Sequence, residues 1–133
     1  MKVLFLDFDG VLHATAGRAF VHVPALAAAL IGHEIGIVIT SSHRIHQPIA
    51  HMIDRLGELG PLVVGVTPVI GSGENRQREI ESWAKEHGVE DFLVLDDDAR
   101  LFDPIWPPLI LCNSQNGIDV SLIDIVKAWL SVT

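Results

Sequence analysis

The chain of 133 residues is poor in cysteine and has no apolar stretch long enough to span a membrane. Cys112 is its single cysteine, which excludes an internal disulfide and fits a reducing compartment. The N-terminus has one lysine before a short apolar run that soon meets two aspartates, unlike a secretory signal peptide. We therefore expect a soluble cytoplasmic protein with no membrane partner, in which Cys112 is a small buried hydrophobe near a strand end.

Basic residues are also scarce. Nine Lys and Arg stand against 17 Asp and Glu, giving a formal net charge of −8. Proteins that bind nucleic acids along an extended surface are usually basic, so we expect no broad nucleic-acid-binding surface. A nucleic-acid end as substrate stays open, because such a site needs only local positive charge and a metal.

Apolar residues, by contrast, are plentiful and regularly distributed. They make up 49% of the sequence, and the length is that of one domain, so we expect a single domain over residues 1–133. Alternating strand and helix patterns favour an α/β fold with a mainly parallel five-stranded sheet covered on both faces. Expected strands are 2–8, 34–40, 62–66, 92–95 and 109–112; expected helices are 24–30, 48 to Gly57 or Gly60, 74–87 and 121–130. In the last helix we expect Leu122, Ile125, Val126 and Trp129 to face the core.

The most informative segment is Asp7-Phe8-Asp9-Gly10-Val11, directly after the first expected strand. Side chains alternate along a strand, so Asp7 and Asp9 are expected close together on one side. Two crowded carboxylates repel unless a cation or a proton intervenes, and Gly10 allows a sharp turn. Asp and Gly are also common in solvated turns. The position at a strand end favours a hard-cation site with one carboxylate as nucleophile or base.

Other strand ends carry polar residues that can converge with this pair. The carboxyl ends of parallel strands lie on one edge of the sheet. Carboxylates suit magnesium, a hydroxyl with backbone N–H groups can hold phosphate oxygens, and an arginine can neutralise a phosphate. The segments concerned are Thr40-Ser41-Ser42, Asp96-Asp97-Asp98, and Arg76 with Arg78 at the start of the helix before the fourth strand.

Taken together, these segments resemble the four motifs of the haloacid dehalogenase-like (HAD) superfamily. The matching segments are Leu6 to Leu12, Ile39 to Ser41, Arg76 or Arg78, and Leu95 to Asp97. Thr40-Ser-Ser-His-Arg44, with Leu12-His13, is similar to small HAD domains associated with RNA-repair proteins, in which a Ser-Ser-Trp-Arg run is common. His43 stands here in place of that tryptophan.

The resemblance implies a three-layer Rossmann-like fold and a Mg²⁺ site. Asp7 would be the nucleophile and a metal ligand. Asp9 would be the general acid and then the general base, with its backbone carbonyl on the metal. Asp97, with Asp96, would complete the metal shell.

The resemblance also implies a phosphoryl site. Thr40, helped by the Ser41 backbone, would hold the phosphoryl group, and Arg76 would stabilise its oxygens. We also expect Gly10, Ser41 and Arg44 to lie against the substrate, with His13 and His43 nearby.

Two assignments stay open at this point. The basic residue of the third motif could be Arg76, Arg78 or Lys85; Arg76 is preferred because it starts the helix. Three acids, Asp96 to Asp98, follow the fourth strand; Asp98 is expected to cap the next turn instead of binding the metal.

The spacing leaves no room for a large cap, only for a small flap at 11–22. In this superfamily an open site is often associated with macromolecular substrates, or with a partner subunit as lid, so the sequence leaves the oligomeric state open. We expect a Mg²⁺-dependent phosphatase acting on a phosphorylated small molecule or macromolecule, such as a nucleotide or a polynucleotide end. The alternatives are a catalytically silent HAD-like binding module and a phospho-accepting signalling domain, although the third strand of such a domain normally ends in an acid and Leu62 to Thr67 contains none.

Overall fold

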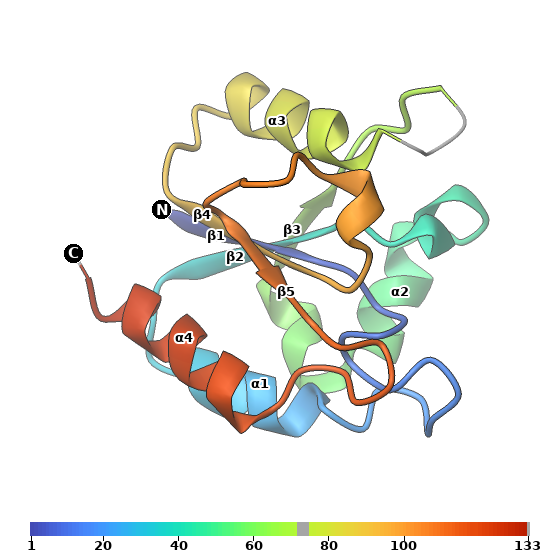
Figure 1. The fold of residues 1–133 in the computed structure, drawn as a ribbon, viewed down its shortest axis with the longest axis vertical. Coiled ribbons are helices and arrows are strands. Elements are labelled where there is room, and N and C mark those ends of the chain that lie inside the picture. Colours follow the sequence, from blue (N-terminus) through green and yellow to red (C-terminus); the bar gives the residue numbers. More distant parts are fainter. Residues whose placement is uncertain (72–74, 133) are drawn as a thin grey trace.

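The structure is a computed structural model that describes residues 1–71 and 75–132. The described residues form five strands, four α-helices and three short 3-10 helices; an α-helix follows each strand except β4, which is followed only by a 3-10 helix (Figure 1). The strands are β1 (Lys2–Leu6), β2 (Ile35–Ile39), β3 (Val63–Val66), β4 (Phe92–Asp96) and β5 (Leu109–Leu111). The helices are α1 (Val23–Leu30), α2 (Ile49–Arg55), α3 (Arg76–Glu86) and α4 (Val120–Leu130); the 3-10 helices are η1 (Ser42–Ile45), η2 (Gly57–Leu62) and η3 (Ala99–Leu101).

The five strands form one parallel sheet in the order β3-β2-β1-β4-β5. The first strand is central, so β2 and β4 flank it. Leu6 at the end of β1 is level with Ile39 in β2 and with Leu95 in β4. The predicted α/β fold with a five-stranded parallel sheet is confirmed.

Alternation along β1 divides the core into two layers. Leu4 and Leu6 point to the face covered by α1 and α4, whereas Val3 and Phe5 point to the face covered by α3. Figure 1 shows α1 and α4 on one side of the sheet and α3 on the other. Phe5 meets the ring of Trp83 from α3 edge-on, with 5.8 Å between ring centroids. These are the three layers of a Rossmann-like fold.

Several element ends differ from the predicted ones. The first strand ends at Leu6 instead of residue 8, because the Phe8 carbonyl accepts the N–H groups of Val11 and Leu12 in a turn. The helix after Pro48 ends at Arg55, before either predicted glycine, and η2 follows it. The predicted start of the third helix at Glu74 lies outside the described residues.

The buried face of α4 also differs from the predicted one. Ile123, Val126 and Leu130 are buried, whereas Ile125 is 48% exposed. Leu122 and Trp129 are half-buried at the edge of the core. The sequence of this helix has apolar residues on two overlapping stripes, and packing against the sheet and α1 selects the stripe through Ile123.

The segment between β1 and α1 contains turns and one isolated bridge, between Asp9 and His13, instead of a helix or regular strand. Phe20 of this segment packs edge-on against Phe8, with 5.3 Å between ring centroids. Within the described part of the chain, no large cap domain lies over the sheet edge. Cys112 lies buried in the core, as predicted. Within residues 1–71 and 75–132, none of the helices has the length and apolar character needed to cross a membrane.

We predict that Leu4→Ala destabilises the protein by about 2–5 kcal/mol, because it removes a fully buried side chain from the central strand. Urea unfolding provides the measurement. Leu111→Ala is the matched control, since Leu111 is 47% exposed on the edge strand β5 and should cost less than about 1 kcal/mol. Equal losses for the two variants would contradict this description of the core.

Candidate active site

Asp7 lies between Thr40 and Asp96 at the carboxyl edge of the sheet. Its backbone N–H donates to Leu95 O at 3.1 Å, so the β1–β4 ladder continues one residue beyond β1. The N–H of Thr40 donates to Leu6 O at 3.0 Å and continues the ladder with β2. Parallel pairing thus brings together residues that are more than 30 positions apart in the sequence.

Three carboxylates form a tight group at this edge. Oxygens of Asp7, Asp96 and Asp97 lie within 4.8 Å of one another, and Asp7 and Asp96 are buried. The Asp96 carboxylate is fixed, since its Oδ1 accepts the N–H of Asp97 at 2.8 Å and that of Asp98 at 3.0 Å. Mg²⁺ holds oxygen ligands at about 2.0–2.1 Å, which places them up to about 4.2 Å apart. Small adjustments would let this group bind such a cation.

Arg76 is the single arginine that the structure brings against these carboxylates among the described residues. Its Nη1 lies 2.7 Å from Asp96 Oδ2 and 3.3 Å from Asp7 Oδ1, at the first residue of α3. Arg78 and Lys85, the other two candidates, are exposed on the same helix. The geometry therefore favours Arg76 as the basic residue of the third motif.

Burial and crowded charge together strongly perturb the pKa of Asp7. Burial, followed by the charge of Asp96, raises its pKa from 3.8 to about 7, while Arg76 acts in the opposite direction. One arginine faces three carboxylates, so the group as a whole favours a proton or a cation. Because the folded pKa lies above 3.8, the contribution of Asp7 to the stability of the cation-free protein falls as the pH rises from 3.8 to about 7.

A glycine is needed at position 10 because the Asp97 side chain lies where a Cβ atom would be. Its φ is +79°, a conformation that other residues rarely adopt. A Cβ placed on Gly10 would lie 2.1 Å from Asp97 Oδ2. The sequence predicted a turn and a substrate contact at Gly10. The structure shows the turn and shows that Gly10 makes space for one of the three clustered carboxylates, while the substrate contact stays a prediction.

The structure places Thr40 and Ser41 at the sheet edge beside Asp7, where the Thr40 N–H donates to the Leu6 carbonyl. The Thr40 hydroxyl is buried and has no hydrogen-bond partner among the described residues. Buried polar atoms normally have a partner, so this hydroxyl is suited to a ligand oxygen. Ser41 caps η1, because its hydroxyl accepts the His43 N–H at 3.2 Å.

Arg44 does not have the free donors that a substrate contact would need. All five of its N–H positions are used: by carbonyl oxygens of Thr40, Ser41, Thr67 and Pro68, and by Glu79 Oε1 at 2.8 Å. The Arg44 side chain is 3% exposed and that of Glu79 is 1% exposed. We therefore correct the predicted substrate-binding role: Arg44 ties the loops after β2 and β3 to α3.

Asp9 differs from Asp7 in its surroundings. Its carboxylate is half-exposed and is not part of the three-carboxylate group. It accepts His13 Nε2 and His43 Nε2, each at 2.8 Å. Burial alone would raise the pKa of Asp9, but the hydrogen bonds from His43 and His13 outweigh it and hold the pKa below its usual value.

Strand alternation, from which Asp7 and Asp9 were expected on one side, does not apply to them, since β1 ends at Leu6 before both residues. Asp98 behaves as predicted: it caps η3 by accepting the Arg100 N–H and also binds the Arg100 guanidinium. The contacts of His13 and His43 with the Asp9 carboxylate were not predicted from the sequence. The spacing of four between Asp9 and His13 was the one available signal, whereas His43 lies 34 residues away.

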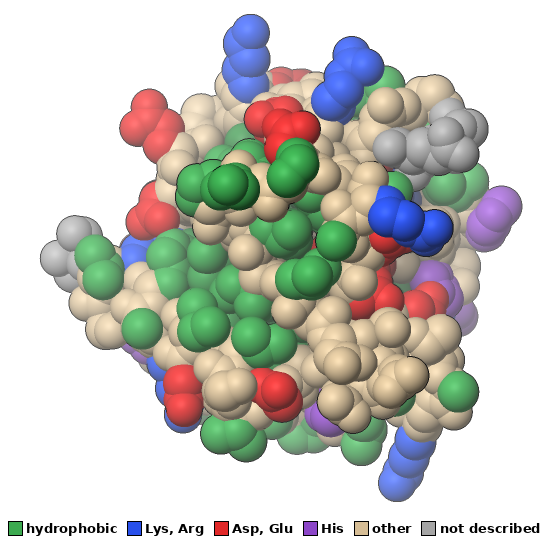
Figure 2. Space-filling model, viewed as in Figure 1, with side chains coloured by type: hydrophobic (Ala, Val, Ile, Leu, Met, Phe, Trp, Pro, Cys, Tyr) green, Lys and Arg blue, Asp and Glu red, His purple; other side chains and the backbone are tan. Residues whose placement is uncertain are grey.

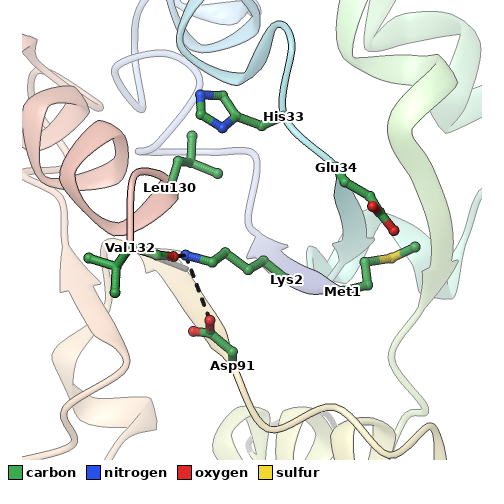
Figure 3. A pocket seen from close by; sticks show the side chains of 7 residues that line it. All are labelled: Met1, Lys2, His33, Glu34, Asp91, Leu130 and Val132. Atoms are coloured by element: carbon green, nitrogen blue, oxygen red, sulfur yellow. Dashed lines mark hydrogen bonds and ion pairs between the residues drawn. The ribbon is translucent and has the colours of Figure 1, made fainter.

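Figure 2 shows acidic side chains gathered beside a histidine on one side of the molecule. A separate hollow lies at the opposite, amino-terminal edge of the sheet (Figure 3). There Lys2 pairs with Asp91 at 3.7 Å, and its amine also donates to the carbonyls of Trp129 and Val132. These contacts of Lys2 hold the end of α4 against β1. Among the described residues that line this hollow, no group of three carboxylates comes together as at the opposite edge.

This fold, with acids after β1 and β4, a hydroxyl after β2 and a base at the start of α3, is that of the HAD superfamily. Residues 3–121 match the family of HAD domains in Swiss Army Knife RNA repair proteins, and the chain belongs to that family. No curated protein and no solved structure matches the sequence.

We predict that Gly10→Ala abolishes stabilisation of the protein by Mg²⁺, because the added methyl group displaces Asp97. Gly32→Ala is the matched control: its φ is +80° but a Cβ there would meet nothing within 4 Å. It should cost about 1–2 kcal/mol and keep the response to Mg²⁺. Thermal unfolding with and without Mg²⁺ measures both effects, and a full Mg²⁺ response in Gly10→Ala would contradict the assignment.

The affinity for Mg²⁺ should also depend on pH. Below pH 7 the cation must displace a proton from Asp7, so the affinity should fall by about tenfold per pH unit, and it should level off above pH 7. Calorimetric titration between pH 5.5 and 8.5 gives this dependence. Asp98→Asn should leave it unchanged, since Asp98 lies outside the group. An affinity that is flat across this range would rule out Asp7 as the titrating ligand.

Proposed function

We propose that the protein is a Mg²⁺-dependent phosphatase that hydrolyses a phosphomonoester through an aspartyl-phosphate on Asp7. The observation that carries this proposal is the position of Asp7: it is buried, grouped with Asp96 and Asp97, and 3.3 Å from Arg76. A carboxylate held between a cation site and an arginine can attack phosphorus while the charge on the phosphoryl oxygens is neutralised.

The carboxylates of Asp7, Asp96 and Asp97, with the backbone carbonyl of Asp9, would hold the cation. When bound, the cation would supply positive charge to the phosphoryl oxygens and offset the repulsion within the group. Arg76 would add a second positive charge from α3. The unpartnered Thr40 hydroxyl and the N–H groups that follow it would donate to the remaining phosphoryl oxygens.

In the first step, an Asp7 oxygen attacks phosphorus and the ester P–O bond breaks, while Asp9 gives a proton to the leaving oxygen. In the second step, a water molecule attacks phosphorus, gives its proton to Asp9, and frees Asp7 and phosphate. The lowered pKa of Asp9 suits the second step, in which it must be ionised. A phosphate dianion beside Asp9 favours its protonated form, which the first step requires.

For the substrate, we propose a terminal phosphate on a polynucleotide. The family to which the chain belongs is described by its occurrence in RNA repair proteins. The absence of a large cap leaves the sheet edge open to a chain end. The net charge of −8 favours recognition of one terminal phosphate over binding along a nucleic-acid backbone.

The test is phosphate release from 3′- and 5′-phosphorylated RNA oligonucleotides and from an aryl phosphate. We expect turnover with Mg²⁺ that EDTA removes. Asp7→Asn should reduce it to background, because the nucleophile is lost, and Asp9→Asn should reduce it by about 10²–10⁴-fold.

Asp103→Asn serves as the control, since Asp103 is an exposed acid bound to Gln77. It should retain the activity of the unmodified protein. Turnover that survives Asp7→Asn would refute the mechanism. Cation binding without release of phosphate from any of these substrates would favour a silent binding module instead.

A further inference from the structure

The Asp9 carboxylate is held from two sides by histidines. His13 Nε2 lies 2.8 Å from Oδ1, and His43 Nε2 lies 2.8 Å from Oδ2. His13 comes from the turn just after Asp9, whereas His43 comes from η1, after β2. Each carboxylate oxygen thus has one ring nitrogen as a partner and keeps a further lone pair.

The partners of the opposite ring nitrogens fix which nitrogen carries the proton. His13 Nδ1 lies 3.1 Å from the backbone nitrogen of Phe20, which can only donate. His43 Nδ1 lies 3.3 Å from Nη1 of Arg55, which also can only donate. Both Nδ1 atoms therefore accept, and both rings donate to Asp9 through Nε2–H.

These outer partners are themselves tied together. Phe20 is at φ +56°, a strained conformation for a residue with a side chain, and its N–H bond to His13 helps to hold it there. The Arg55 guanidinium stacks over the Phe20 ring at 4.9 Å and donates to Gln47 Oε1 at 2.9 Å. Gln47 Nε2 lies 3.3 Å from His43 Nδ1. The flap, η1 and α2 are thereby joined around one carboxylate.

A metal ion held by these three residues is not supported. Among the described residues, the group of three possible ligands within 4.8 Å of one another is Asp7, Asp96 and Asp97, and the two histidines do not form such a group with Asp9. Both Nε2 atoms also carry protons in this arrangement. The histidines hold opposite ends of the carboxylate instead of facing a common centre.

We propose that His13 and His43 are positioning residues that hold the Asp9 carboxylate in the orientation needed for proton transfer at the scissile oxygen. This inference rests on the proposed phosphatase function and adds two residues to it. The Asp9 side chain is 53% exposed, so the lone pairs that the histidines leave free remain accessible to a leaving group or to water. Without His43, the carboxylate could rotate about its side-chain bonds and lose its alignment.

The test compares His43→Leu, which removes the donor, with His43→Gln, whose amide nitrogen can take the place of Nε2–H. The His43 side chain is 25% exposed and lies outside the core, so both variants should fold. His51→Leu is the control, because His51 is an exposed histidine on α2. The substrates are 4-nitrophenyl phosphate, phenyl phosphate and glycerol 2-phosphate, in order of rising basicity of the leaving oxygen.

A basic leaving oxygen needs the proton from Asp9 more than a weakly basic one does. We expect His43→Leu to lower kcat/KM by less than about fivefold for the nitrophenyl ester and by about 30-fold or more for glycerol 2-phosphate. His43→Gln and His51→Leu should stay close to the unmodified protein on all three substrates. Equal losses of His43→Leu on all three substrates, or none, would overturn the positioning role.

Nitrogen NMR of the histidine rings gives a readout that does not require activity. We expect His13 and His43 in the Nε2–H form, and loss of protection of both protons in Asp9→Ala. An Nδ1–H form at His43 would overturn the proposed arrangement. An unmodified protein that hydrolyses neither these three esters nor the phosphorylated oligonucleotides with Mg²⁺ would instead overturn the proposed function and, with it, the role in proton transfer. The NMR result would still decide the geometry.

Discussion

The repulsion among three carboxylates at one edge of the sheet governs the rest of the site. Asp7 and Asp96 are buried at the ends of neighbouring strands, and Asp97 is pressed against Gly10. Arg76 offsets part of this charge, yet burial and the charge of Asp96 still raise the pKa of Asp7 to about 7. Three close carboxylates raise the free energy of the folded protein unless a cation is bound. Such a group is therefore suited to bind a cation and, through it, a phosphoryl group.

Around this group, the chain uses two different kinds of support. Arg44 lies almost fully buried and joins the loops after β2 and β3 to Glu79 of α3, the helix that also carries Arg76. Asp9 sits in a more exposed setting, held by His13 and His43. The buried inner part of the site, around Arg44 and Glu79, would thus hold Asp7 and Arg76 rigidly in place. The exposed outer part, around His13 and His43, would hold Asp9, the residue that transfers protons.

The sequence allowed much of the inner part to be predicted, because it follows from strand order. Once the strands are parallel, residues at the carboxyl ends of β1, β2 and β4 must meet, and this brings Asp7, Thr40 and Asp96 together. The outer part could not be predicted in the same way. It depends on where β1 ends, on the turn around Phe20, and on a contact across 34 residues to His43. Arg44 was misjudged because its residue type fits a phosphate ligand, and only the packing reveals that its donors are all used.

The central claim, that Asp7 becomes phosphorylated, can be tested by chemical trapping of the intermediate. The protein is mixed with Mg²⁺ and a phosphorylated oligonucleotide, quenched in acid within the first turnover, and reduced with borohydride, which converts an aspartyl-phosphate to homoserine. Peptide mass spectrometry then locates the modified residue. We expect homoserine at position 7, and none when Mg²⁺ is withheld. Turnover without modification of Asp7, or with modification at another aspartate, would contradict it.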